Sequence, residues 1–120
     1  MANEISLNAT IQYAKGNFAD QRTIQCQADV SGTVATGGVQ KIGTTHEAVN
    51  MGDVGTAGWA WFLNTDATNF ITLGIVVSGT FYPVMKLKPK IGFPLCLGTN
   101  ALYAKADTAE ATLQYTIYEA

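Results

Sequence analysis

Residues 58–89 carry the sequence GWAWFLNTDATNFITLGIVVSGTFYPVMKLKP, which is typical of three strands separated by two turns. Side chains alternate between the two faces of a strand, so Trp59, Trp61 and Leu63 share one face of the first strand. Its other face is apolar as well, which predicts that both faces of this strand are covered. The polar cluster at residues 64–69 supplies side chains that bond to nearby backbone, as turns require.

Two residues inside this stretch predict irregular places in the strands. Gly74 interrupts the second strand, where a glycine indicates a bulge or the close approach of another backbone. Pro83 cannot donate to a strand ladder, so the third strand is expected at a sheet edge or with a bulge. Lys86 and Lys88 favour the edge, because lysines there block unwanted strand pairing.

The rest of the chain continues the strand pattern, without any helical periodicity. Further strands are predicted at residues 4–13, 22–30, 91–97, 101–105 and 111–118. Residues 34–58 hold many glycines and few large apolar side chains. They predict weak strands at 38–45 and 45–51 in a segment that gains order from a partner. Eight or nine short antiparallel strands in one domain, residues 1–120, predict an all-β sandwich or small barrel.

The composition bounds what the chain binds. Charged residues make up 13% of the 120 residues and the net charge is −2, against a usual charged share of about 25%. Free monomers carry more charge for solubility, so we expect other subunits to cover part of the surface. The mild acidity argues against nucleic acid as a partner, since phosphate binding needs clustered Lys and Arg. The N-terminus has no signal-peptide pattern, and no apolar run is long enough to span a membrane, so we expect a soluble, cytosolically made protein.

The residues that usually carry chemistry are few and scattered. His46 is the only histidine, and nothing marks a catalytic triad or a zinc-ligand spacing around it. The polar residues at 64–69 include oxygens that calcium accepts, but a capped turn is the favoured interpretation. Cys26 alternates with apolar neighbours and is predicted to be a small core residue. Cys26 and Cys96 are expected to be free thiols, with a bridge between them left open. We therefore expect no enzyme activity, no metal and no cofactor.

Several residues are candidates for an interface with other subunits. Lys86, Lys88 and Lys90 either protect a sheet edge or form a basic strip that docks on an acidic protein surface, and the sequence leaves both interpretations open. The outward Thr, Gln and Asn side chains of the first two strands and the Gly-rich residues 34–58 are further candidates. The candidate interface residues are Lys86, Lys88, Lys90, Val39, Ile42, His46, Val49 and Met51.

The second half of the chain resembles a group of small virion proteins of tailed bacteriophages. The motifs that carry the resemblance are GWAWFLNTDATNFITLG, GTFYPVMKLKP and LYAKADTAEATLQYTIYE, which together span Gly58 to Glu119. The corner Pro89-Lys90-Ile91-Gly92 departs from the Pro-Gly-Glu that is more usual in this group.

The resemblance implies a β-sandwich of jelly-roll type and a non-enzymatic structural role. A capsid decoration or cement protein is the expected function, placed on the outer surface of the phage head after synthesis in the host cytoplasm. Its expected partners are the major capsid protein and copies of itself in a homotrimer. A tail, collar or baseplate component is one alternative. A host-glycan-binding module is another, and it predicts exposed Trp59, Trp61 or Tyr82 around a groove, whereas core positions are favoured for both tryptophans.

Overall fold

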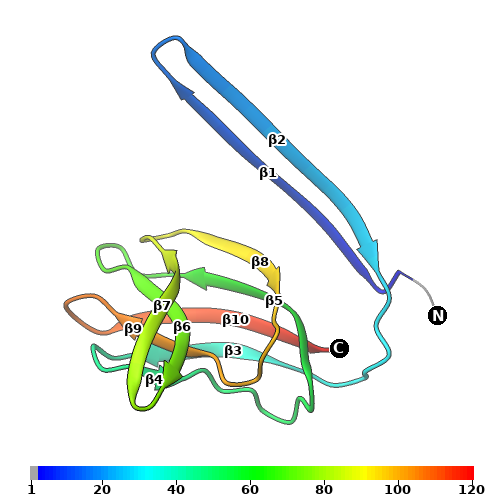
Figure 1. Cartoon of the computed structure of the whole chain (residues 1–120), viewed down its shortest axis with the longest axis vertical. Coiled ribbons are helices and arrows are strands. Elements are labelled where there is room, and N and C mark those ends of the chain that lie inside the picture. Colours follow the sequence, from blue (N-terminus) through cyan, green and yellow to red (C-terminus); the bar gives the residue numbers. More distant parts are fainter. Residues whose placement is uncertain (1–2) are drawn as a thin grey trace. The chain divides into compact units, whose positions relative to one another are not determined.

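The computed structural model describes residues 3–120, which divide into two units. The first unit, up to Ser31, contains β1 (Ile5–Lys15) and β2 (Phe18–Ala28), which form one antiparallel hairpin (Figure 1). The second unit, Gly32–Ala120, contains strands β3 to β10. We call residues 3–31 the N-terminal hairpin and residues 32–120 the sandwich.

The N-terminal hairpin pairs in one unbroken register, from Ile5 opposite Ala28 to Lys15 opposite Phe18. Its tight turn contains Gly16 with φ +60°, a conformation that glycine adopts without steric cost. Side chains close the other end of the ribbon. The Glu4 carboxylate accepts a bond from the Val30 amide (2.8 Å), and the Asn3 amide donates to the Asp29 carboxylate (2.7 Å).

The sandwich consists of two four-stranded antiparallel sheets. Its strands are β3 (Ala35–Ile42), β4 (Glu47–Ala48), β5 (Ala57–Asn64), β6 (Ile71–Val77), β7 (Thr80–Leu87), β8 (Gly92–Cys96), β9 (Tyr103–Ala106) and β10 (Ala111–Glu119). One sheet has the order β3-β10-β5-β8 and the other β4-β9-β6-β7 (Figure 1). The first sandwich strand therefore pairs with the last, and the second with the next to last. This is jelly-roll topology, and the predicted all-β sandwich is confirmed.

The extent of the sandwich differs from the single domain predicted over residues 1–120. All sandwich strands lie within residues 32–120, and the described part of the chain has ten strands rather than eight or nine. The reason is local. A turn of only two residues joins β1 to β2, so the two strands satisfy each other's backbone along their full length and form a sheet of their own.

The core lies between the two sheets of the sandwich. It is formed by the inward residues of β5, β6 and β10 together with side chains of the loops, and its largest members include Phe62, Leu73, Leu113 and Ile117, each 0% exposed. The rings of Phe62 and Tyr115 stack with centroids 6.5 Å apart. Burying one such side chain stabilises the fold by about 1.5–3 kcal/mol, so the core is the main source of stability.

Both irregularities predicted for the central stretch are confirmed. β7 is the edge strand of its sheet, and the β6–β7 register shifts between Leu73 and Gly74. Gly74 lies opposite Pro83, and a β-carbon at Gly74 would collide with the carbonyl oxygen of Tyr82. The glycine is therefore required by the close approach of the edge strand.

The predicted turn at residues 64–69 is capped by its own side chains. Asp66 accepts bonds from the amides of Asn69 (2.6 Å) and Thr68 (2.9 Å). These bonds favour the ionised carboxylate and lower the pKa of Asp66. Asn64 is fully buried and donates to the carbonyl oxygens of Asn69 and Leu87. The capped turn is thus a structural element that joins β5 to the end of β7.

The Gly-rich residues 34–58 are held by bonds within their own unit, in contrast to the prediction that they need a partner for order. The Glu119 carboxylate accepts from the amides of Gly55 (2.9 Å) and Thr33 (3.1 Å), and these two bonds lower its pKa. Asn100 accepts from the amide of Ala57 (2.8 Å) and donates to the Gly55 carbonyl (2.9 Å). Side chains from distant parts of the sequence thus hold this segment in place by hydrogen bonds, although the segment itself has few large apolar residues.

Across residues 3–120 the structure contains no helix of the length and apolarity that crossing a membrane demands.

Candidate functional site

One face of the N-terminal hairpin is apolar and open. Paired residues in an antiparallel ribbon share a face, so Leu7 lies beside Cys26, Ala9 beside Ile24 and Ile11 beside Arg22. The exposed fraction is 71% for Ile11, 57% for Ile24 and 62% for Phe18 at the turn. The rings of Tyr13 and Phe18 contact each other with centroids 5.5 Å apart. This face, which we call the apolar ribbon, is apolar where Leu7, Ala9, Ile24 and Cys26 lie, and it also carries Arg22, Asp20 and Lys15 in the half nearer the turn.

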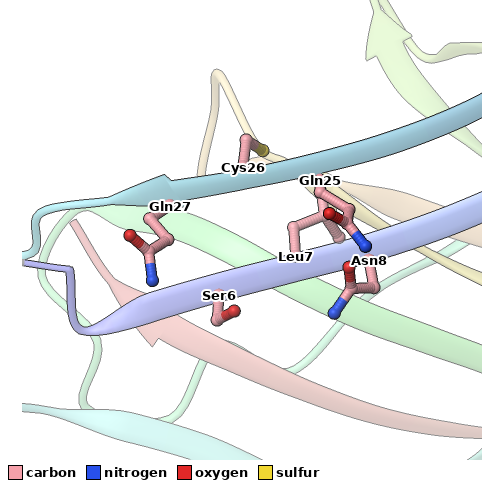
Figure 2. Close-up of a pocket in the computed structure, with 6 residues that line it drawn as sticks. All are labelled: Ser6, Leu7, Asn8, Gln25, Cys26 and Gln27. Carbon is pink, nitrogen blue, oxygen red and sulfur yellow. The ribbon is translucent and has the colours of Figure 1, made fainter.

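The opposite face of the hairpin is polar but uncharged. Ser6 lies opposite Gln27, Asn8 opposite Gln25, Thr10 opposite Thr23 and Gln12 opposite Gln21. Figure 2 shows the side chains of Ser6, Asn8 and Gln27 on one side of the strands, with Cys26 pointing to the other. A hollow of about 490 Å³ lies at this part of the ribbon. Amide and hydroxyl groups without charge form hydrogen bonds to another protein at low desolvation cost.

A second surface poor in charge lies on the sandwich. The outer side of the β3-β10-β5-β8 sheet presents a central row of Trp59, Trp61 and Leu63 on β5. Pro94 and Cys96 of β8 lie beside this row. On its other side lie the outward residues of β10 and β3, which are Thr112, Gln114, Thr116, Tyr118, Ala35, Gly37, Val39 and Lys41. We call this surface the tryptophan face.

The placement of the two tryptophans corrects the prediction that they belong to the core. Trp59 is half-buried and Trp61 is 37% exposed, both on the tryptophan face. The inward positions of β5 belong to Ala60 and Phe62, which are buried. The sequence did not distinguish the two faces because both are apolar. Here the expected cover on the outer face of β5 is incomplete.

A third candidate surface is a hollow of about 670 Å³ on the β4-β9-β6-β7 sheet. His46 stacks on Phe81 with ring centroids 5.8 Å apart and meets Tyr103 edge-on at 5.9 Å. The Lys86 ammonium lies 4.1 Å from the centre of the Phe70 ring. Lys105 and Asp107 also line this hollow, which we call the basic hollow. It can accept a small acidic or aromatic group of a partner.

The remaining candidate interface residues fall into two groups. Val39 (69% exposed), Lys88 and Lys90 are at the surface, and the Lys90 ammonium donates to the Thr65 carbonyl (2.9 Å). By contrast, Ile42 (0% exposed) and Val49 (3%) lie in the core, so their side chains present no surface to a partner. They were chosen because their segment is poor in large apolar residues, but these few fill the core. Met51 packs partly against the same core.

The structure does not join the three predicted lysines into one strip. Lys86 belongs to β7, whereas Lys88 and Lys90 follow the end of the strand, and Lys90 has φ +65° in the corner. Lys86 is instead accompanied by Lys105 from β9, since both lie opposite Thr72 of β6. That pairing arises from sheet topology and has no signal in the local sequence.

Both cysteines are free and exposed. The expectation of free thiols is confirmed, and the core position predicted for Cys26 is wrong. Cys26 belongs to the apolar ribbon, where alternation indicates a shared face but says nothing about its cover. Among residues 3–120, no three His, Cys, Asp or Glu side chains gather as metal ligands would.

Sequence reasoning named the polar face of the first two strands as an interface and missed their apolar face. The signal was available, because two amphipathic strands joined by a two-residue turn pair with each other first. A two-stranded sheet has no second layer of its own. Its apolar side is therefore open unless another element covers it.

Comparisons of the chain with protein-family models, with curated proteins and with solved structures find no match. Its role is therefore inferred from its own surfaces and from the motif resemblance of residues 58–119.

Proposed function

We propose that this chain is a non-enzymatic structural protein of a tailed-bacteriophage particle. Its role is that of a decoration or cement protein that binds the outer surface of the head and stabilises contacts between capsid subunits. The partners are the major capsid protein and neighbouring copies of the chain, assembled as a homotrimer. The chain is made in the host cytoplasm and acts in the virion.

The observation that carries this proposal is the pair of surfaces on which large apolar and aromatic side chains are exposed. The apolar ribbon exposes Ile11, Tyr13, Phe18 and Ile24, and the tryptophan face exposes Trp61. A typical soluble monomer keeps its largest apolar patch to about 300–600 Å². Surfaces that are enriched in aromatic residues are characteristic of protein interfaces. The jelly-roll fold and the resemblance of residues 58–119 to virion accessory proteins agree with this role.

The mechanism is binding at several places at once. Each copy offers the hairpin, the tryptophan face and the basic hollow, which are built from different strands. Contacts that are individually weak multiply when they are linked in one assembly. A protein that bridges neighbouring capsid subunits in this way resists their separation without any chemical step.

A tail, collar or baseplate role uses the same kind of surface and is the first alternative. The glycan-binding alternative has one supporting observation, the exposure of Trp61 and Tyr82 (52%). These residues lie on different sheets, since Trp61 belongs to β5 and Tyr82 to the edge strand β7. They do not form one aromatic platform, so the glycan-binding role ranks below the structural roles.

Purified particles made by the genome that encodes this chain test the proposal. Quantitative mass spectrometry should find the chain in copy numbers comparable to the major capsid protein. Particles from a deletion mutant should lose their genome at lower temperature, and adding the purified chain should restore their resistance. A few copies per particle would indicate the tail or collar instead, and absence from particles would refute a virion role.

The basic hollow supplies a sharper test of how the chain meets the head. Lys86→Ala removes one positive charge at the hollow, and Lys88→Ala removes one at an exposed position outside its lining as a matched control. If the hollow faces an acidic capsid surface, Lys86→Ala weakens rebinding to deletion-mutant heads more than Lys88→Ala does. The difference should shrink as salt is added, because exposed charges are screened. Equal effects would show that the hollow is not the capsid contact.

A further inference from the structure

We propose that the basic hollow binds an extended acidic segment of a partner protein, with a carboxylate held between Lys86 and Lys105 and an apolar side chain beside Phe81. The inference rests on the proposed function and deepens it, because it names the chemistry of the segment that the hollow receives. A row of lysines, an aromatic wall and the position of the hollow beside an edge strand carry it.

Two lysines lie on either side of one threonine on the outer face of the β4-β9-β6-β7 sheet. Thr72 of β6 pairs with Lys86 of β7 and with Lys105 of β9, and paired residues share a face. The neighbours of Thr72 on β6, Ile71 and Leu73, are 0% exposed, so this row of three side chains points away from the core. Neighbouring β-carbons in such a row are about 5 Å apart. Two flexible ammonium groups can therefore meet at one carboxylate above the threonine.

The positive charge of this row has no ion-pair partner within residues 3–120. The ion pair in that part of the chain joins Arg22 to Asp20 in the hairpin, so no acid neutralises either lysine of the hollow. The Lys86 ammonium is placed by the Phe70 ring, whose centre lies 4.1 Å away. Asp107 is the one acid among the residues that line the hollow, which leaves an excess of positive charge there. Such a site attracts a carboxylate, whereas two lysines are too few to hold a nucleic-acid backbone.

The other part of the hollow is aromatic and apolar. His46 stacks on Phe81 with ring centroids 5.8 Å apart, and Pro83 of the same strand as Phe81 also lines the hollow. These rings present flat apolar surface that an aliphatic or aromatic side chain can cover. A purely ionic site would need no such wall. The hollow therefore fits a segment in which an acidic residue lies near an apolar one.

The shape of the hollow favours a segment of chain over a small free anion. Its lining extends along β7 from Thr80, next to the β6–β7 turn, to Lys86, a distance of about 20 Å along the strand. β7 is the edge strand of its sheet, so no strand of the described chain closes that side. The volume of about 670 Å³ is within the range of ligand sites, roughly 300–1,000 Å³. A small anion would occupy the lysine end alone and leave the aromatic wall bare.

Nuclear magnetic resonance on the isotope-labelled full-length chain tests the inference with two synthetic peptides. The acidic probe is acetyl-Phe-Asp-Glu-amide, and its neutral counterpart is acetyl-Phe-Asn-Gln-amide. The acidic peptide should shift the amide signals of Thr72, Phe81 and Lys105 and leave those of the tryptophan face unchanged. The neutral peptide should bind about fivefold more weakly, because it forms no charge pair with the lysines. Equal binding of the two peptides, or shifts spread over both sheets, would overturn the inference.

Charge-changing variants separate a specific site from general attraction. Lys86→Ala and Lys105→Ala should each raise the dissociation constant of the acidic peptide about threefold, whereas Lys88→Ala, outside the lining, should change it less than about 1.5-fold. Asp107→Asn removes the acid of the lining and should lower the dissociation constant about twofold. All four positions are exposed, so the variants keep the fold. If Lys88→Ala weakens binding as much as the other two lysine variants do, the attraction is general and the inference fails.

The aromatic wall has a test of its own. Phe81→Ala should weaken binding of the acidic peptide about threefold, and His46→Ala, which removes the stacked ring from the other side, replaces it if that variant unfolds early. Sodium acetate and inorganic phosphate are the probes for a site that holds small anions. If either anion binds as tightly as the acidic peptide, or if neither ring variant weakens the peptide, the hollow is a small-anion site and the inference is wrong.

These outcomes are distinguishable from those of the particle experiments. A chain that binds the acidic peptide at the hollow but is absent from virions keeps the acidic-segment site and loses the proposed function. A chain that is abundant on heads but whose hollow binds both peptides equally does the reverse.

Discussion

Replacing the buried Asn64 by alanine should produce one of the largest losses of stability in the sandwich. Asn64 is 0% exposed at the end of β5. Its Nδ2 donates to the carbonyl oxygens of Asn69 (2.8 Å) and Leu87 (3.0 Å), and its Oδ1 accepts from the Asp66 amide (3.0 Å). One side chain thus joins β5, the capped turn and the end of edge strand β7.

The magnitude follows from what Asn64→Ala leaves behind. Three hydrogen bonds disappear, each with a net contribution of about 1 kcal/mol. The Leu87 carbonyl also loses a partner at a residue that is 0% exposed, and an unsatisfied buried group costs about 1–3 kcal/mol. We expect a loss of about 4–6 kcal/mol in the free energy of unfolding. An ordinary domain has a free energy of unfolding of only about 5–15 kcal/mol, so this loss would be a large part of the total.

Urea unfolding followed by tryptophan fluorescence measures this loss. Both tryptophans belong to the sandwich, so the signal reports on that unit and not on the hairpin. Glu110→Ala, at an exposed turn position, is the control and should shift stability by no more than about 0.5 kcal/mol. A loss below about 1 kcal/mol for Asn64→Ala would refute the reasoning, because water would then be satisfying the groups described as buried.

Three further substitutions have definite outcomes. Gly74→Ala places a methyl group against the Tyr82 carbonyl and should cost about 1–3 kcal/mol, seen as a lower Tm by circular dichroism; an unchanged Tm would contradict the close approach. Leu73→Ala should lose about 2–5 kcal/mol in urea unfolding because the side chain is fully buried, whereas Val84→Ala, 69% exposed, should lose little. Glu119 has a lowered pKa because backbone amides bond to its carboxylate, so its stabilising effect is present above its unfolded pKa and disappears as pH falls through its folded pKa. Glu119→Gln should therefore have a lower Tm than the wild type at neutral pH, and this difference in Tm should become smaller in acid. A Tm difference that stays constant with pH would show that the carboxylate charge is not involved.

The local sequence pattern was sufficient to predict the strands of the sandwich and the residues that share a face of each strand. The inward residues predicted for the last strand, Ala111, Leu113, Tyr115 and Ile117, are all buried. Burial also raises the pKa of Tyr115 by disfavouring the charged phenolate. Gly74 and Pro83 were informative for a different reason, since each has a backbone property that only a few strand positions tolerate.

The local sequence pattern could not predict which element covers the apolar face of a strand. The first strand alternates as regularly as the last, yet Ile11 is 71% exposed while Ile117 is 0% exposed. The pleat sets the period of two, and the covering layer comes from long-range topology such as the β3–β10 pairing. The same limit explains the errors at Ile42, Val49 and Cys26, whose environments depend on strands distant in the sequence.

The distribution of charge connects the two units to one role. The hairpin confines Lys15, Asp20 and Arg22 to its turn half, and Asp20 forms a 3.3 Å ion pair with Arg22 at the surface. In the sandwich, Lys86 and Lys105 lie on the sheet opposite the tryptophan face. In the sandwich, positive charge therefore gathers on the sheet opposite the tryptophan face, whose own lysine, Lys41, lies on β3. In the proposed role, this arrangement leaves the basic hollow free to meet an acidic capsid surface while the tryptophan face meets another subunit.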